Sequence, residues 1–159
     1  MKLQLKKATP KDAEELFNLQ VKAFMPLLEK YQDYKTSPAN ETLEKTISRI
    51  NYKLGNYYKI IFNNMLAGAI RIVWWEDTTR YRLGSIFIAP EFQGKGIAQQ
   101  VINMVEKLYP QATTWELDTI LQEKKNCYLY EKMGYSQGEE RKIINDNMTI
   151  VFYKKYVLN

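Results

Sequence analysis

The sequence predicts a single mixed domain of the α/β or α+β class, in which helices pack on a central sheet of about seven strands. The expected elements follow in the order strand, two helices, three strands, helix, strand, helix and two strands. The length of 159 residues suits one hydrophobic core and is short for two. A composition of 45% hydrophobic and 26% charged residues is ordinary for a globular protein.

The first elements are a strand and an amphipathic helix. Residues 3–8 roughly alternate apolar and polar side chains, as a strand does. Thr9 can cap a helix that has Pro10 at its first position, and apolar residues then recur every three or four positions. We expect this helix to run to Pro26 or slightly beyond, and a loop to follow over residues 29–40.

The later elements follow from apolar spacing and from turn residues. The pair Asn63-Asn64 is typical of a tight hairpin, Asp77 begins the next turn, and Gly134 ends a helix. In order, we expect a helix over residues 43–54, strands over 57–62, 65–75 and 81–89, a helix from Gly94 and Gly96 to Pro110, a strand over 113–118, a helix over 124–133, and strands over 135–144 and 148–158.

The chain contains no histidine and one cysteine, Cys127. This composition excludes Ser-His-Asp and Cys-His catalysis, histidine-ligated metals and an intramolecular disulfide, so we expect no metal site. Any general base must be a carboxylate, a tyrosine, a water or a chain terminus. The formal net charge of +5 favours anionic ligands in general without identifying one.

The central feature is a strand that leads through Gln93-Gly94-Lys95-Gly96-Ile97-Ala98 into a helix. Glycines let backbone N–H groups turn around an anion, and the start of a helix adds further free N–H groups and a positive dipole end. The loop therefore suits a pyrophosphate. It is neither a Walker loop, whose Gly-Lys-Ser/Thr string is missing, nor a dinucleotide fingerprint, because Gln99 stands where the third glycine is required.

This loop resembles the acyl-CoA loop of the GNAT superfamily, the Gcn5-related N-acetyltransferases, whose pattern is Gln/Arg-x-x-Gly-x-Gly/Ala. Residues 86–92 before it resemble the family's fourth strand and the Pro-Glu-aromatic turn that follows. After it, Leu129-Tyr130-Glu131-Lys132-Met133-Gly134-Tyr135 is similar to the family's Leu-Tyr-Glu-Lys-x-Gly-aromatic signature. The resemblance implies a mostly antiparallel, mixed sheet of about seven strands with about four helices, and acetyl-CoA as the cofactor.

In this family the fourth strand carries a bulge and splays from the fifth, which leaves a V-shaped slot for the pantetheine arm. The resemblance therefore implies cofactor contacts through the backbones of Ile86, Phe87 and Ile88, with the amide of Ile88 polarising the thioester oxygen. Asn126 matches an asparagine that reaches the cofactor. Tyr130 occupies the position of the general acid, and its hydroxyl faces the departing sulfur.

Direct transfer to an amine requires a group that accepts the ammonium proton. Glu116 and Asp118 on the expected fifth strand and Glu76 at the end of the third are the candidates, and a water chain is equally compatible with the sequence. The family's acceptor groove implies contacts from residues in the loop after the first helix and on the third and fourth strands. Its candidates here are Tyr31, Tyr34, Trp74, Tyr81 and Arg82, with Asp33 or Glu76 available for a cationic acceptor and Arg71 or Arg82 for a carboxylate.

We therefore expect an acetyl-CoA-dependent N-acetyltransferase that acts on a primary amine of a small molecule or peptide. A catalytically silent CoA-binding sensor of the same fold is one alternative, and a basic nucleic-acid-binding module is another. Lysine and arginine are scattered among acidic residues, so we expect no nucleic-acid partner. Without a long apolar run or a signal peptide, a cytoplasmic location and no membrane partner are expected. A homodimer is an expectation from the family alone.

Overall fold

The computed structural model describes residues 2–76 and 78–157, and they form one seven-stranded sheet with helices packed on it. The predicted turn residue Asp77 and the predicted strand end at Leu158 lie outside the described residues. The strands are β1 (Leu3–Lys7), β2 (Gly55–Phe62), β3 (Met65–Trp74), β4 (Arg80–Ile88), β5 (Thr114–Ile120), β6 (Ser136–Asn145) and β7 (Met148–Tyr156), and the α-helices are α1 (Ala13–Tyr31), α2 (Leu43–Ile50), α3 (Ile97–Leu108) and α4 (Lys124–Lys132).

The strand order in the sheet is β1-β2-β3-β4-β5-β7-β6. Every neighbouring pair is antiparallel except β4 and β5, which run parallel because α3 connects them. The hairpin between β2 and β3 turns at Asn63 and Asn64, which both have positive φ, as a tight two-residue connection requires. The predicted class of fold, with seven strands and one parallel pair, is therefore confirmed.

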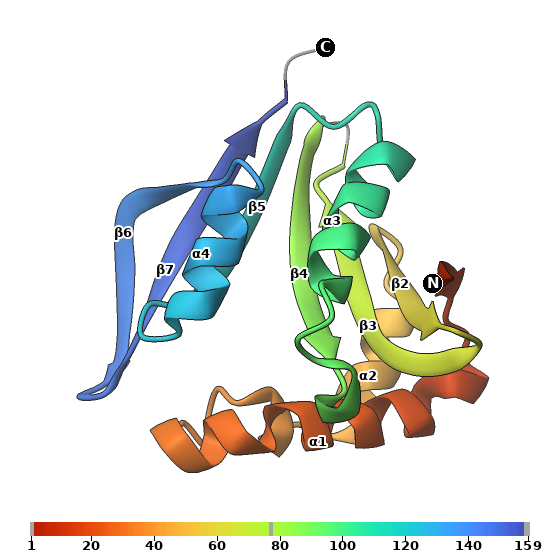
Figure 1. The fold of residues 1–159 in the computed structure, drawn as a ribbon, viewed down its shortest axis with the longest axis horizontal. Coiled ribbons are helices and arrows are strands. Elements are labelled where there is room, and N and C mark those ends of the chain that lie inside the picture. The colour runs from red at the N-terminus through yellow and green to blue at the C-terminus, as the bar shows by residue number, and fades with distance from the viewer. Residues whose placement is uncertain (1, 77, 158–159) are drawn as a thin grey trace.

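Helices cover both faces of the sheet. On one face, α3 buries Ile97, Val101, Ile102 and Val105 in the main core, to which Trp115 of β5 and Tyr153 of β7 also contribute. On the other face, Leu16 of α1 packs in a smaller cluster with Tyr57, Ala69 and Phe87. Figure 1 shows α1 lying across the end of the sheet at which β4 and β5 have moved apart.

Helix α1 is longer than the sequence indicates. Residues 29–31, which were expected to start a loop, are its last residues, and Pro26 lies inside the helix. Leu28 and Tyr31 are both buried, so packing holds the turn beyond the proline. Gln32 then ends the helix in the left-handed conformation, and its N–H donates to the carbonyl of Leu28 at 2.7 Å.

The other boundaries lie close to those predicted, apart from α2. This helix ends at Ile50, so Leu54 is not part of its apolar face. Within the described residues, no helix combines the length and the apolar character that a membrane crossing requires.

Candidate active site

Strands β4 and β5 pair along only part of their length. Residues Arg80–Arg82 of β4 face Thr114–Glu116 of β5, and the remaining residues 83–88 of β4 have no partner on that side. On the opposite side, Arg71 of β3 faces Ser85 while Ile72 faces Leu83, so Gly84 is an extra residue in the ladder. A bulge of this kind bends a strand and increases its twist. The bulge and the splay together open a V between β4 and β5 (Figure 1).

The opening exposes backbone donors of β4. Ala89 donates its N–H to Ala67 of β3 at 2.7 Å, and the N–H groups of a strand alternate between its two edges. The N–H groups of Ile86 and Ile88 therefore point toward the side from which β5 has diverged. Backbone donors without a strand partner are available to a ligand that lies in the slot.

The glycine loop continues from the end of β4 and has room for a diphosphate. Gly94 and Gly96 have φ values of +77° and +75°, and a Cβ added at either would meet no atom within 4 Å. No side chain caps the start of α3 at Ile97, so its first N–H groups are free to bind an anion. Exposed Lys95 adds a positive charge, and the open cradle fits the diphosphate of coenzyme A.

Gln93 and Ile97 act within the loop itself. The side chain of Gln93 donates to the carbonyl oxygen of Ile88 at 2.9 Å, which ties the loop back to the end of β4. Ile97 is buried in the main core, and Ala98 beside it is half-buried. These side chains position the backbone that forms the cradle.

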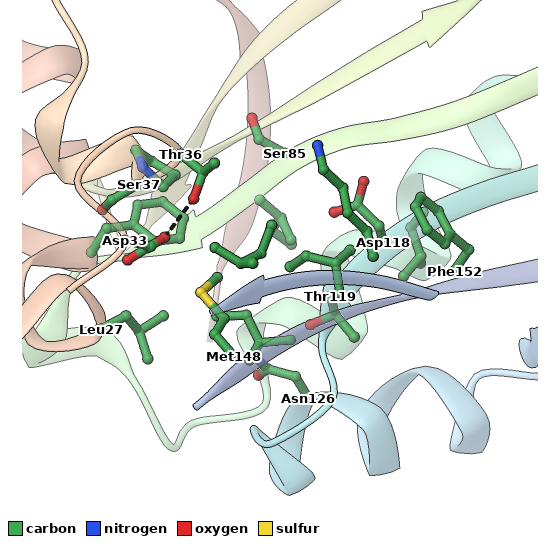
Figure 2. A pocket seen from close by; sticks show the side chains of 18 of the residues that line it. Leu27, Asp33, Thr36, Ser37, Ser85, Asp118, Thr119, Asn126, Met148 and Phe152 are labelled. Atoms are coloured by element: carbon green, nitrogen blue, oxygen red, sulfur yellow. Dashed lines mark hydrogen bonds between the residues drawn. The ribbon is translucent and has the colours of Figure 1, made fainter. Parts of the chain in front are cut away.

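A cavity of about 430 Å³ lies in the open part of the V. Its walls come from the end of α1 and the loop after it, from β4, β5 and α4, and from the hairpin of β6 and β7, as Figure 2 shows. The sequence-predicted residues that line it are Ile86, Asp118, Asn126 and Tyr130, together with Asp33. Among the lining residues that sequence reasoning did not include are Thr36, Ser37, Ser85, Thr119, Lys142, Met148, Ile150 and Phe152.

Tyr130 is buried at the wall of this cavity. Burial raises the pKa of its hydroxyl to about 12, and the negative charge of Asp118 and the nearby Cys127 act in the same direction. Its ring packs against Tyr135 and Tyr153 at centroid distances of 6.2 and 6.1 Å. The hydroxyl therefore keeps its proton at neutral pH and can donate it in a hydrogen bond.

The three candidate bases lie in different surroundings. Asp118 lines the cavity and forms an ion pair with Arg82. Glu116 lies in the closed part of the V, where hydrogen bonds from Arg80 hold the pKa of its carboxyl below the usual range. Glu76 lies beyond the end of β3, beside a separate hollow that Tyr52 and Lys53 also line. Of the three, only Asp118 is in contact with the cavity.

Asp33 is a second carboxylate at the cavity. It is 8% exposed, and Thr36 donates a hydrogen bond of 3.0 Å to its Oδ2 atom (Figure 2). Among the ion pairs of residues 2–76 and 78–157, none includes Asp33. A buried carboxylate that forms no ion pair is suited to hold an ammonium group.

The predicted aromatic walls lie elsewhere. Trp74 and Tyr81 pack with Tyr109 and Trp115 at the closed end of the V, with Tyr81 at 5.6 Å from Trp74 and 5.4 Å from Trp115. Tyr34 is exposed, and its ring is not part of the cavity wall. Phe87 is buried and packs edge-to-face on Phe24 at 6.0 Å, so its side chain belongs to the core.

Tyr31 and Arg82 form contacts around the cavity without lining it. Tyr31 is buried, and its hydroxyl donates to the carboxylate of Glu123. The guanidinium of Arg82 is engaged by Asp118. Both residues therefore contact neighbours of the cavity, and Arg82 binds Asp118 through one N–H of its guanidinium.

Solved structures of acetyltransferases share this fold. A spermidine N-acetyltransferase SpeG chimera from Vibrio cholerae and hSSAT has 19% identity and a TM-score of 0.76, over 98% of this chain and 96% of that one. The PaiA N-acetyltransferase from Thermoplasma acidophilum, solved with coenzyme A, has 15% identity and a TM-score of 0.73, over 99% of this chain and 100% of that one. The microcin C7 self-immunity acetyltransferase MccE, solved with acetyl-CoA and AMP, has 18% identity and a TM-score of 0.75, over 98% and 93%.

Of the two sequence comparisons, one gives a match. No curated protein sequence matches the chain. The model of the acetyltransferase (GNAT) family matches residues 14–135, which is well over half of the chain and includes the glycine loop and Tyr130. The chain therefore belongs to the acetyltransferase (GNAT) family, and it is an enzyme that depends on acetyl-CoA.

Proposed function

We propose that this enzyme transfers the acetyl group of acetyl-CoA directly to a primary amine of a small molecule or peptide, which binds in the 430 Å³ cavity. The observation that carries the proposal is the position of this cavity. It lies where β4 and β5 separate, and Tyr130, Asp118 and the unpaired Asp33 all line it. One cavity thus holds a proton donor and two carboxylates.

The residues that hold the cofactor in this proposal are those of the slot and the loop. The N–H groups of Gly94, Gly96 and the first turn of α3 bind the diphosphate, and Asn126 contributes from the start of α4. When bound, acetyl-CoA supplies an activated acetyl thioester. The N–H of Ile88 donates to the carbonyl oxygen that gains negative charge during transfer, and such donors act strongly in a site without water.

Proton transfer is assigned to two side chains. Asp118 accepts the proton that the incoming ammonium must lose, either directly or through a water. Tyr130 donates a hydrogen bond to the departing sulfur, and its raised pKa keeps the donor proton in place. Direct transfer means that no acetyl-enzyme intermediate forms, since such an intermediate would need an activated nucleophile. The chain has no histidine to activate one, and the thiol of its single cysteine, Cys127, is buried beside the carbonyl oxygens of Ile120 and Leu121.

The test is thiol release from acetyl-CoA in the presence of polyamines, amino acids, aminoglycosides and peptide amino termini. We expect one of these classes to be consumed, and Tyr130→Phe to lower kcat about a hundredfold or more with little change in CoA affinity. Tyr128→Phe is the matched control, because Tyr128 lies on the same helix and is 68% exposed. A protein that binds CoA but consumes no thioester with any amine would instead be a silent sensor.

Localisation and assembly are further proposals with separate tests. A cytoplasmic enzyme would fractionate with soluble marker proteins, and a homodimer would appear at twice the mass of 18.8 kDa in light scattering. Binding to nucleic acid that weakens with salt, without CoA binding, would favour the nucleic-acid module.

A further inference from the structure

Arg71 on β3 is a cation without an acidic partner in the part of the chain that the structure describes. Its Nε atom is buried and donates to no acceptor. The neighbouring arginines are engaged, because Arg82 binds Asp118 and Arg49 binds Glu41 through two hydrogen bonds of 2.6 and 2.9 Å. The Nε edge of the Arg71 guanidinium therefore lacks a hydrogen-bond acceptor.

Two further buried side-chain atoms lack a partner, and one of them belongs to the residue opposite Arg71. Within residues 2–76 and 78–157, the buried side-chain atoms that lack a hydrogen-bond partner are Arg71 Nε, the hydroxyl of Tyr57 and Oγ1 of Thr46. Tyr57 is the cross-strand partner of Arg71. Thr46 shares a face of α2 with Ile50, one turn later, and Ile50 packs on the cluster that contains Tyr57. Arg71 and Tyr57 therefore lie side by side on one face of the sheet, and Thr46 lies on the helix that packs over this face.

The chemistry of this region favours an anion. Buried polar atoms in folded proteins are nearly always hydrogen-bonded, so unpartnered atoms on the adjacent residues Arg71 and Tyr57 indicate a missing partner. A guanidinium can only donate, so a partner that it shares with the Tyr57 hydroxyl must accept. Burial and the repulsion from Arg49 both hold the pKa of Arg71 below its usual range, which means that a negative charge placed here would be stabilised.

The region adjoins the acceptor cavity through the bulge in β4. A Cβ built on Gly84 would lie 3.5 Å from Nη1 of Arg71, and Gly84 lines the cavity. Ser85, which is the cross-strand partner of Arg71, lines the cavity as well. Because Gly84 has no side chain, the guanidinium lies directly behind the cavity wall.

We propose that Arg71, with Tyr57 beside it, binds a carboxylate of the acceptor, so that the enzyme acetylates an amine which also carries a carboxylate, such as an amino acid. This inference rests on the proposed function. The cavity then offers Asp33 and Asp118 to the ammonium group. Arg71, behind the wall at Gly84 and Ser85, takes the carboxylate. A polyamine has no group for Arg71 and would be repelled by it.

The first test compares amino acids with their carboxamides as acceptors, in matched pairs that differ only in the charge of the carboxyl group. We expect the carboxylates to have a kcat/KM about ten- to a hundredfold above that of the amides, which is the value of a hydrogen bond to a charged group. Arg71→Gln removes this preference by lowering kcat/KM for the carboxylates alone. Arg141→Gln, at an exposed position on β6, is the matched control and keeps the preference.

The second test measures ligand binding without turnover, through the Tm of the protein. N-acetylglycine should raise the Tm of the wild-type protein, N-acetylglycinamide should not, and Arg71→Gln should abolish the difference. Tyr57→Phe should raise the Tm without ligand, because it removes a buried hydroxyl that has no partner.

The outcomes separate the two proposals. If amines are acetylated but no carboxylate is preferred over its amide, and no carboxylate raises the Tm, the region holds ordered water only and this inference is overturned. If no amine at all is acetylated, the proposed function itself is overturned, whatever the carboxylates do to the Tm.

Discussion

The hydroxyl of Tyr31, the last residue of α1, donates a hydrogen bond to the carboxylate of Glu123, which immediately precedes α4. Lys30 binds the same carboxylate at 2.8 Å, and Asn145 of the β6–β7 hairpin donates to the carbonyl oxygen of Tyr31 at 2.9 Å. These contacts join the end of α1 to both elements on the far side of the cavity. They connect the two halves of the sheet at the end where β4 and β5 have separated.

The contact between Tyr31 and Glu123 should make stability depend on pH. Burial opposes ionisation of Glu123, but the hydrogen bonds from Lys30 and Tyr31 outweigh it and hold the pKa of the carboxyl below its usual range. A lowered folded-state pKa stabilises the protein above the unfolded value of about 4.3, and this contribution is lost as the pH falls through the folded value. Glu123→Gln should therefore lower the free energy of unfolding at pH 7, and the difference from wild type should shrink below about pH 4.

The control for this measurement is Glu91→Gln. Glu91 pairs with Lys22 at 3.7 Å on the surface, where such pairs contribute little. Urea unfolding at several pH values checks both variants. If the free energy of unfolding depended on pH equally in the two variants, the Glu123 contact would contribute no more than a surface ion pair.

Two glycines should respond differently to alanine. A Cβ at Gly68 would overlap the carbonyl oxygen of Phe87, so Gly68→Ala must push β3 away from β4. We expect a loss of at least about 1–3 kcal/mol, as for other overpacked sites. At Gly94 the space is open, and only the positive φ opposes a side chain, which costs about 1–2 kcal/mol. Urea unfolding should rank Gly68→Ala as the more damaging change, while calorimetry should find weaker CoA binding for Gly94→Ala.

Gln93 should affect the cofactor without being required for folding. Its hydrogen bond to Ile88 fixes the loop relative to the slot, so Gln93→Ala should raise the Kd for coenzyme A about three- to tenfold. Gln100→Ala, at an exposed position of α3, is the control and should leave the Kd unchanged. Isothermal titration calorimetry measures both Kd values. Equal increases in the two variants would show that the effect does not come from the hydrogen bond between Gln93 and Ile88.

The pH profile should show no loss of activity from Tyr130 below about pH 10. Its phenol has a pKa of about 12, and the donor role requires the protonated form, so the descending limb lies above that range. The rate should rise with pH as the acceptor amine loses its proton. A fall in kcat/KM between pH 8 and 10 that disappears in Tyr130→Phe would contradict this assignment.

Asp118 and Glu116 can be separated by matched substitutions. Asp118→Asn should lower kcat/KM at neutral pH by about a hundredfold, with recovery at high pH where the amine is already neutral. Glu116→Gln should change kcat/KM little, because its carboxyl is bound by Arg80 outside the cavity. Steady-state rates from pH 6 to 10 decide between them, and a larger loss for Glu116→Gln would reverse the assignment.

Much of the fold could be predicted because local signals agreed with the final structure. Asn63-Asn64 has the backbone that its hairpin requires, and Gly94 and Gly96 have the positive φ values that a glycine loop requires. The end of α1 could not be predicted in the same way. Pro26 indicates a helix end locally, whereas the helix continues because Leu28 and Tyr31 are buried by distant parts of the chain.

The candidate site could likewise be predicted only where its residues carry a local sequence signature. Tyr130 and Asn126 carry a local signature, and both line the cavity. Trp74 and Tyr81 looked equally suitable for an acceptor groove, but the sequence does not reveal at which point β4 leaves β5. They lie in the paired part, where aromatic rings fill the core. Lys142 and Met148 come from a hairpin whose approach to β4 depends on the whole sheet, so no local pattern could have included them.

The opening between β4 and β5 has a consequence for how this protein tolerates insertions and deletions. The register of β3 with β4 is regular on both sides of Gly84, so removing that residue would restore an unbroken ladder and leave every other pairing in place. Such a protein would keep its core and lose the bend that separates the strands. One surplus residue in β4 therefore accounts for the bend on which the open slot depends.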